Sequence, residues 1–315
     1  MITEEIIEDV GYEVMKRAVS EIPPDISKAM RDEYQNELSA DAKRVYESFF
    51  DYVDRRTKLG GSICPDTGTI MYYITIGNKT SLHPELDFWR PLAKATVRLT
   101  KEGILSPKSG DPIRHINNNL NIGENSPSLQ FKFAPGIDFI EITAVAKGGG
   151  GEMSGSKFRM LTTADNLPGI KKFIIDSAIS SAKGGLNCPP AIYGIGIGGG
   201  LGIAATIAHE AAVLRPVGSR NPDKYIADIE KELLELINYS EVGPAGLGGR
   251  CTALDVHIEY SNGHTMVVAV GLVSQCLMAH RATAEVHPDG SIRKLTYPNA
   301  WFRRPWRKYY EEVTR

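Results

Sequence analysis

The stretch from Asn187 to Gly202 reads Asn-Cys-Pro-Pro-Ala-Ile-Tyr-Gly-Ile-Gly-Ile-Gly-Gly-Gly-Leu-Gly. Cys188 precedes two prolines, and the ring of Pro189 restricts the backbone that presents the Cys188 sulfur. A buried-strand pattern at residues 191–197 runs into glycines, and the apolar, Ala-rich segment 203–213 predicts a helix. A thiol on a stiff turn, beside backbone that can approach a ligand closely, is typical of a binding or catalytic site.

Two chemistries compete to explain this stretch. Gly194, Gly196 and Gly199 fit the GxGxxG pattern of dinucleotide binding, which would make the chain a nicotinamide-dependent dehydrogenase. That pattern requires a second strand that ends in Asp or Glu about 20 residues further on, whereas residues 214–220 are typical of a loop. The other possibility is ligation of a metal or a cluster by Cys188, and it depends on partners elsewhere in the chain.

Bulk composition excludes several classes of protein. The chain has 315 residues, a formal net charge of −2 and 23% charged residues, which gives no sign of a nucleic-acid partner. No apolar run approaches the length of a membrane span, and the acidic residues 1–5 lack the pattern of a signal peptide. Four cysteines are too few for a disulfide scaffold of this size. We therefore expect a cytoplasmic protein with reduced thiols and with no nucleic-acid or membrane partner.

Helix and strand patterns mix without a strict βαβ alternation. Helices are predicted at residues 4–20, 40–56, 88–101 and 168–183 and from residue 222 onward, and strands at 69–76, 129–134, 137–146, 252–260 and 265–271. The two strands that flank Pro135-Gly136 predict a hairpin. We expect an α/β mixture (α+β) of mixed sheets with flanking helices. An N-terminal helical region (1–60) would precede a central domain (61–290) and an aromatic-basic tail (291–315).

The cysteines are the candidate ligands. They are spread along the chain as Cys64, Cys188, Cys251 and Cys276, and their wide spacing excludes a local zinc-finger pattern. One explanation is four buried small hydrophobes, a common state of free cysteine. However, Cys64 and Cys188 precede prolines and Cys276 ends a strand pattern, whereas Cys251 lies inside a strand pattern and should be structural. Three thiolates would suit an iron–sulfur cluster in which one iron lacks a protein ligand and polarises a substrate oxygen.

Loops supply further candidates for the same site. Asp66 would donate or accept a proton near the cluster, and Arg114 would bind a carboxylate. His264 would act as an acid or base or orient the substrate. The glycine run that begins at residue 148 can offer backbone N–H groups to an anion. Each residue also has a simpler explanation, since Asp66 and His264 suit turns and Arg114 suits a surface.

Several motifs occur together in one order. They are Cys64-Pro65-Asp66-Thr67-Gly68, the segment 121–127, Lys147-Gly148-Gly149-Gly150, Cys188-Pro189-Pro190, the segment 214–222, Gly246-Leu247-Gly248-Gly249-Arg250, and Cys276 with Ala279-His280-Arg281. Over residues 40–290 this set resembles the α subunit of the iron–sulfur-dependent class I fumarases and the related L-tartrate dehydratases. Two positions depart from the family pattern, because Pro65 replaces a usual Gln and Ala282 replaces a frequent Arg or His.

The resemblance implies a site and a reaction. It implies that the domain 61–290 binds a [4Fe–4S] cluster and is catalytic. The implied cluster ligands are Cys64, Cys188 and Cys276. A small dicarboxylate substrate would contact Asp66, Arg114, Gly148, Gly149, Gly150 and His264. The implied enzyme is a hydro-lyase that reversibly hydrates fumarate to L-malate, or alternatively one that dehydrates L(+)-tartrate.

The resemblance also implies a partner. The family completes its active site with a second region, fused or separate, and we expect here a separate β subunit in a hetero-oligomer. The aromatic-basic tail would dock that subunit or pack on its own body. A non-enzymatic iron–sulfur sensor or scaffold is the alternative from another class, and turnover of a dicarboxylate by anaerobic protein with its partner would distinguish the two.

Overall fold

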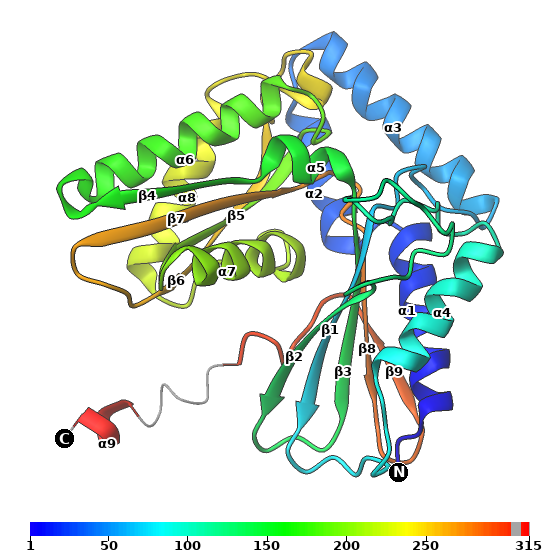
Figure 1. The fold of residues 1–315 in the computed structure, drawn as a ribbon. Helices are drawn as coiled ribbons and strands as arrows, with labels where there is room; N and C mark the ends of the chain where they lie inside the picture. Colours follow the sequence, from blue (N-terminus) through cyan, green and yellow to red (C-terminus); the bar gives the residue numbers. More distant parts are fainter. Residues whose placement is uncertain (304–309, 315) are drawn as a thin grey trace. The chain divides into compact units, whose positions relative to one another are not determined.

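A computed structural model describes residues 1–303 and 310–314 of the chain (Figure 1). It contains helices and two mixed sheets, which confirms the predicted α+β class. The chain forms two compact units. Unit 1 comprises Met1–Glu21, Gly60–Ala146 and His280–Arg315, and unit 2 comprises Ile22–Leu59 and Lys147–Ala279. This division cuts across the regions 1–60, 61–290 and 291–315, whose boundaries as domains stay a prediction.

Unit 1 is a five-stranded sheet with helices on one face (Figure 1). In spatial order its strands are β2 (Ser128–Ala134), β1 (Thr69–Gly77), β3 (Ile140–Lys147), β8 (Arg281–Val286) and β9 (Ile292–Leu295). Two helices cover it, α1 (Glu4–Ser20) and α4 (Trp89–Lys101). Apolar residues recur every three to four positions in α1, so Ile7, Val10 and Val14 share one face and are buried against the sheet.

The predicted hairpin around Pro135-Gly136 is wrong. The strands β2 and β3 flank that turn, but β1 lies between them in the sheet. β2 pairs with β1 in parallel, with Ser128 opposite Met71. The burial of each strand explains the order. β3 is buried along its whole length and suits a central position, whereas most of β2 is exposed or half-buried and suits an edge.

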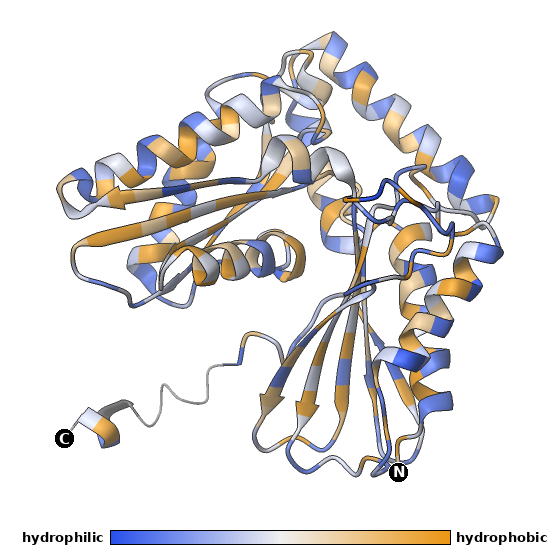
Figure 2. Cartoon of the chain, viewed as in Figure 1, coloured by the Kyte–Doolittle hydropathy of each residue, from blue (hydrophilic) through white to orange (hydrophobic). Residues whose placement is uncertain are grey.

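Unit 2 is a four-stranded sheet between helices. In spatial order its strands are β4 (Lys157–Thr162), β7 (Val267–Gln275), β5 (Ala191–Gly198) and β6 (Ala253–Ser261). On one face the helices α6 (Asn166–Lys183) and α8 (Lys224–Asn238) pack around the buried Tyr193 and Ile195. The residues that alternate with these two along β5 point to the opposite face, and the mostly apolar helix α7 (Leu201–Leu214) covers it (Figure 2).

Glycines let α7 lie directly on β5. A Cβ added at Gly194 would lie 2.1 Å from the carbonyl oxygen of Ala208, and one at Gly196 would lie 2.0 Å from that of Ala204. Two members of the GxGxxG pattern are therefore explained by close packing of a strand on a helix. This packing needs no nucleotide.

The N-terminal helices belong to different units. α1 is in unit 1, whereas α2 (Pro24–Asn36) and α3 (Ala40–Lys58) are in unit 2. The pair Pro23-Pro24 predicts the end of a helix, so the sequence patterns do not predict α2. In the structure Pro24 begins α2, because proline is favoured in the first turn of a helix. The short helices α5 (Gly149–Gly155) and α9 (Tyr310–Thr314) complete the set. Among the described residues, no helix is both long and apolar enough to span a membrane.

The start of the C-terminal tail packs on unit 1. Glu141 accepts hydrogen bonds from the backbone N–H of Asn299 at 2.7 Å and of Ala300 at 3.0 Å. Trp301 is buried, and its ring meets that of Tyr73 edge-on with centroids 5.0 Å apart. Other tail residues, Arg304, Trp306, Arg307 and Tyr309, lie outside the described part of the chain. Docking of a partner by the tail therefore stays a prediction.

Candidate functional site

Strand pairing brings the segments of Cys188 and Cys276 to one end of the sheet in unit 2. β5 and β7 are antiparallel, with Ile192 opposite Gln275. Because Cys188 precedes β5 and Cys276 follows β7, both lie at the same sheet end. The backbone N–H of Leu277 donates to the carbonyl oxygen of Cys188 at 3.4 Å. Two of the predicted ligands are thus neighbours in the fold.

The backbone of Cys188 is strained. Its φ is +46°, in the left-handed region, and its side chain is exposed. That conformation costs a residue with a Cβ about 1–2 kcal/mol. Burial as a small hydrophobe cannot explain an exposed cysteine held at this cost. Strain of this kind clusters at functional sites, and an accessible thiol is the reactive or ligating kind.

Cys251 differs from the other cysteines. It is 1% exposed, and its Sγ donates to the carbonyl oxygen of Ala253 at 3.3 Å. Burial, aided by the nearby Glu33 carboxylate, raises the pKa of the Cys251 thiol well above its usual range. Cys251 therefore stays protonated and resembles a structural cysteine, although it precedes β6 and does not lie inside it.

Cys64 and Asp66 lie in unit 1 on a turn tied to its surroundings. The backbone N–H of Ile63 donates to the carbonyl oxygen of Val19 at 2.8 Å. The hydroxyl of Ser106 donates to the carbonyl oxygen of Pro65 at 2.7 Å. Cys64 and Asp66 are both half-buried, so a fixed backbone presents them with part of each side chain accessible.

His280 is a residue near this turn that the sequence does not single out. It is 1% exposed, and its Nδ1 lies 3.2 Å from the carbonyl oxygen of Ala18. Burial lowers the pKa of His280 to about 4, against the opposing effect of the Asp66 charge. The ring is therefore neutral at pH 7 and donates from Nδ1, and its buried Nε2 has no hydrogen-bond partner among the described residues. The Ala279-His280-Arg281 motif is the signal that could have drawn attention to it.

Arg114 lies in a long loop of unit 1 and is exposed. Its guanidinium pairs with Asp111, with 2.7 Å between Nη1 and Oδ2. The backbone N–H of Arg114 also donates to Asp111 Oδ1 at 2.9 Å. Asp111 therefore fixes the arginine within its own loop while the guanidinium remains accessible to a second anion.

Buried Asn121 holds this loop in shape. Its Oδ1 accepts from the backbone N–H of Lys108 at 2.8 Å and of Ser109 at 3.0 Å. Its Nδ2 donates to the carbonyl oxygen of Ser106 at 2.9 Å and to the hydroxyl of Thr100 at 3.1 Å. These four hydrogen bonds help to fix the backbone of the loop that carries Arg114.

The glycine run at 148–150 begins helix α5. Gly148 precedes the helix and Gly149 is its first residue. A Cβ at Gly150 would lie 1.9 Å from the carbonyl oxygen of Leu186, two residues before Cys188. Gly150 thus lets α5 pack against the backbone that leads to Cys188. The structure brings the glycine run and two of the predicted ligand segments into one part of unit 2.

His264 lies elsewhere in the same unit. It is exposed in the connection from β6 to β7, and its Nδ1 accepts from the backbone N–H of Met266 at 3.1 Å. β7 runs from this connection to Cys276 over nine residues, or about 30 Å at a strand's rise per residue. The structure therefore does not bring His264 together with Cys276 of the same chain, and its catalytic role stays a prediction.

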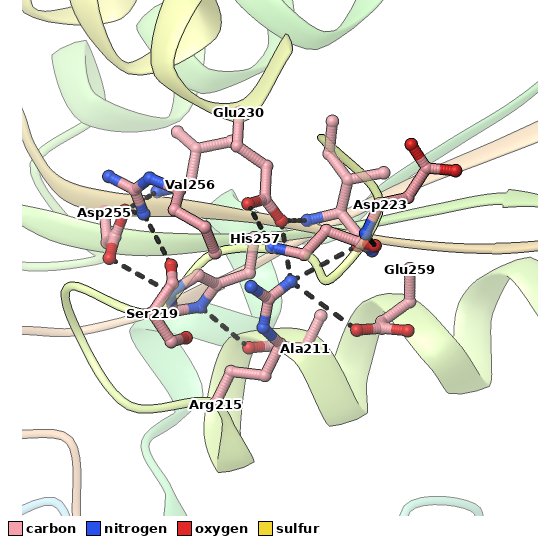
Figure 3. Close-up of polar contacts among 12 residues, drawn as sticks. Ala211, Arg215, Ser219, Asp223, Glu230, Asp255, Val256, His257 and Glu259 are labelled. Atoms are coloured by element: carbon pink, nitrogen blue, oxygen red, sulfur yellow. Dashed lines mark hydrogen bonds and ion pairs between the residues drawn. The ribbon is translucent and has the colours of Figure 1, made fainter. Parts of the chain in front are cut away.

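Two buried carboxylates fix the loop that follows α7 (Figure 3). Glu230, with no exposed surface, accepts from Nη1 of Arg215 at 2.6 Å and from the backbone N–H of Asn221 at 2.8 Å. Asp255 accepts from the backbone N–H of Gly218 at 2.6 Å. These bonds anchor the 214–222 motif onto α8 through Glu230 and onto β6 through Asp255.

Asp255 also contacts two basic side chains. Its Oδ1 accepts from Arg220 Nη1 at 2.7 Å, and its Oδ2 lies 3.0 Å from His257 Nε2. Burial acts to raise the pKa of Asp255, but the charge and hydrogen bond of His257, with Arg220, outweigh burial and lower it. Asp255 lies near the start of β6, opposite Ile192 of β5, so the clamped loop lies at the sheet end that carries Cys188.

The donor chemistry of the cysteines fits an iron–sulfur cluster. Thiolates are the protein ligands of such clusters, and Cys64, Cys188 and Cys276 are exposed or half-buried, whereas Cys251 is not accessible. Among the described residues, neither unit by itself contains three His, Cys, Asp or Glu side chains grouped closely enough to bind a metal ion. The candidate ligands are divided, with Cys64 in unit 1 and the other two in unit 2.

Comparison with known proteins assigns the class. The model of the fumarate hydratase (Fumerase) family matches residues 8–285. A Methanocaldococcus jannaschii protein with the provisional name L(+)-tartrate dehydratase subunit alpha is 34% identical over 287 residues, which is 91% of this chain and 99% of that protein. The L(+)-tartrate dehydratase subunit alpha of Escherichia coli K12 is 29% identical over 276 residues, or 88% of this chain and 89% of that protein.

These matches define a hydro-lyase, which confirms the predicted class of enzyme. The chain belongs to the fumarate hydratase (Fumerase) family. The family resemblance predicted from the motifs is thereby confirmed.

Proposed function

We propose that this chain is the α-type subunit of an iron–sulfur-dependent hydro-lyase that reversibly hydrates fumarate to L-malate. The observation that carries the proposal is Cys188, an exposed cysteine in a strained left-handed conformation, bonded through its backbone to the residue after Cys276. We assign Cys64, Cys188 and Cys276 as the ligands of a [4Fe–4S] cluster. Cys251 is excluded because it is buried and protonated.

The remaining residues then have defined tasks. When bound, the cluster supplies a Lewis acid at an iron without a protein ligand. Arg114 binds a substrate carboxylate through its accessible guanidinium. Asp66, two residues from Cys64, moves the proton that the hydration requires. The backbone N–H groups of Gly148, Gly149 and Gly150 bind anionic oxygen.

A second substrate is supported by the relatives. The M. jannaschii and E. coli proteins that match this chain are named as tartrate dehydratase subunits. The pairs Arg114-His115 and His280-Arg281 are also similar to that branch, whereas Thr252-Ala253-Leu254 is similar to the fumarase branch. Dehydration of L(+)-tartrate to oxaloacetate is therefore the alternative activity.

The name "subunit alpha" of these relatives supports a second subunit for this chain as well. We propose a β subunit that completes the active site in a hetero-oligomer, in the cytoplasm. A non-enzymatic iron–sulfur sensor would bind the cluster without turning over a dicarboxylate.

The test uses the chain co-expressed with its partner subunit and purified without oxygen. Fumarate hydration and L(+)-tartrate dehydration are measured in the wild type, in Cys188→Ser and in the matched control Cys251→Ala. We expect activity in the wild type and the control, and loss of both cluster absorption and activity in Cys188→Ser. Full activity in Cys188→Ser would overturn the proposal. A wild type that holds a cluster but hydrates and dehydrates neither compound would favour the sensor.

A further inference from the structure

Lys147 is a buried cation with unfilled hydrogen-bonding capacity. Its side chain has no exposed surface, and its Nζ lies 3.2 Å from Oε1 of Glu152. An ammonium has three N–H donors, yet among the described residues no hydrogen bond of normal geometry reaches this Nζ. A buried charge is costly unless anions surround it. The site around Lys147 is therefore built for more negative charge than Glu152 alone provides.

The ammonium lies beside the end of β7. A Cβ added at Gly151 would lie 3.2 Å from Lys147 Nζ and also 3.2 Å from the carbonyl oxygen of Ser274. Ser274 is two residues before Cys276, and its hydroxyl lies 3.4 Å from the carbonyl oxygen of Gly151. Because Gly151 of α5 has no side chain, the Lys147 ammonium has room next to the segment that carries Cys276.

Glu152 fixes the position of this ammonium. Its Oε1 lies 3.6 Å from Nε2 of His209 on α7, so groups from two elements hold the carboxylate. The hydrogen bond from His209, with the charge of Lys147, outweighs burial and lowers the pKa of Glu152 to about 2. Glu152 is therefore ionised at neutral pH. Burial lowers the pKa of Lys147, and the charge of Glu152 opposes that shift and holds the ammonium in place.

We propose that Lys147, held by Glu152, is a positioning residue that keeps a fixed positive charge beside Cys276 and raises the reduction potential of the cluster. This inference rests on the proposed function. A reduced cluster carries one more negative charge than an oxidised one, and a nearby cation in a weakly screened site stabilises the reduced form. The charge would thus protect the cluster against oxidation, which removes an iron that lacks a protein ligand.

The test compares Lys147→Met, which removes the charge at similar length, with Lys147→Arg, which keeps it. Lys171→Met is the matched control, because it breaks a 2.6 Å ion pair with Glu232 in the same unit. The anaerobic complex is titrated with a reductant and followed by electron paramagnetic resonance, and the loss of cluster absorption in air is timed. We expect a lower potential and faster bleaching in Lys147→Met, values nearer the wild type in Lys147→Arg, and no change in Lys171→Met.

Wild-type potential in Lys147→Met would overturn the inference. A raised KM for the dicarboxylate with an unchanged potential would also overturn it, because Lys147 would then bind substrate. If Lys147→Met does not fold, Glu152→Gln tests the same pair in the opposite direction, because it removes the carboxylate that offsets the ammonium and should raise the potential. Absence of a cluster from the wild type would instead overturn the proposed function. A cluster that is present, with the same reduction potential in the wild type and in both variants, would overturn this inference alone.

Discussion

The backbone N–H of Leu277 donates to the carbonyl oxygen of Cys188 at 3.4 Å, which joins the turn before β5 to the turn after β7. Antiparallel pairing of these strands sets the distance between the two turns, so two cysteines far apart in sequence are held at one sheet end. The rigidity of a sheet suits a ligand pair, because ligand positions must be accurate to a fraction of an ångström.

Replacement of Cys188 by glycine should separate function from stability. Cys188→Gly removes both the thiol and the left-handed strain, whereas Cys188→Ser removes only the thiol. Both variants should lose the cluster. In the cluster-free protein, Cys188→Gly should have a free energy of unfolding up to about 1 kcal/mol above that of Cys188→Ser, measured by urea titration. A less stable glycine variant would show that the φ of +46° carries no strain.

Replacement of Gly194 by alanine should unfold unit 2 at a lower denaturant concentration. The new Cβ would lie 2.1 Å from the carbonyl oxygen of Ala208, and neither backbone can yield easily. We expect a loss of about 3 kcal/mol or more. Gly202→Ala in α7 is the control, since nothing lies within 4 Å of its Cβ, and it should gain about 0.5 kcal/mol. Binding of NAD by the wild type, measured by thermal shift, would contradict the packing explanation of these glycines.

Local patterns predict most of the elements but not their pairing. Apolar spacing predicts α1 and β5 because burial of a stripe or a face is a local property of the sequence. The order β2-β1-β3 depends on which strands need two neighbours, and the turn at Pro135-Gly136 carries no information about that. A derivation from turns alone therefore gives a hairpin that the molecule does not contain.

For a similar reason, the sequence predicts some residues of the candidate site and misses others. Cys64 and Cys188 can be singled out because prolines follow them. The burial of His280 and Lys147 cannot be predicted in this way. It depends on parts of the fold that are distant in sequence, such as Ala18 beside His280 and the end of β7 near Lys147. The placement of His264 at the opposite end of β7 also follows only from the fold.

The stability of unit 2 should depend on pH through Glu152. Its pKa is lowered from 4.5 to about 2, so the ionised carboxylate stabilises the folded chain above pH 4.5. This contribution should be lost as the pH falls from 4.5 towards 2. Because 42% of the side chain is exposed, screening limits the contribution to about 1–2 kcal/mol. Urea titrations of cluster-free wild type and Glu152→Gln should differ near neutral pH and converge towards pH 2, and a constant difference would contradict the assignment.

Loss of Glu230 should destabilise the chain strongly. Glu230→Ala leaves Arg215 buried without its 2.6 Å partner and removes the acceptor of the Asn221 N–H. Breaking a buried ion pair from one side costs about 3–5 kcal/mol. Asp228→Ala, which breaks an exposed pair with Lys224 on the same helix, should leave the stability almost unchanged. Similar unfolding midpoints for the two variants would show that the clamp on the 214–222 loop is dispensable.

The most direct test of the cysteine assignment is the iron and acid-labile sulfide bound per chain after anaerobic reconstitution. The comparison includes the wild type, single serine variants of Cys64, Cys188 and Cys276, and the control Cys251→Ala. The assignment predicts a full cluster in the wild type and the control, and a lost or incomplete cluster in each serine variant. A full cluster in Cys188→Ser, or its loss in Cys251→Ala, would contradict it.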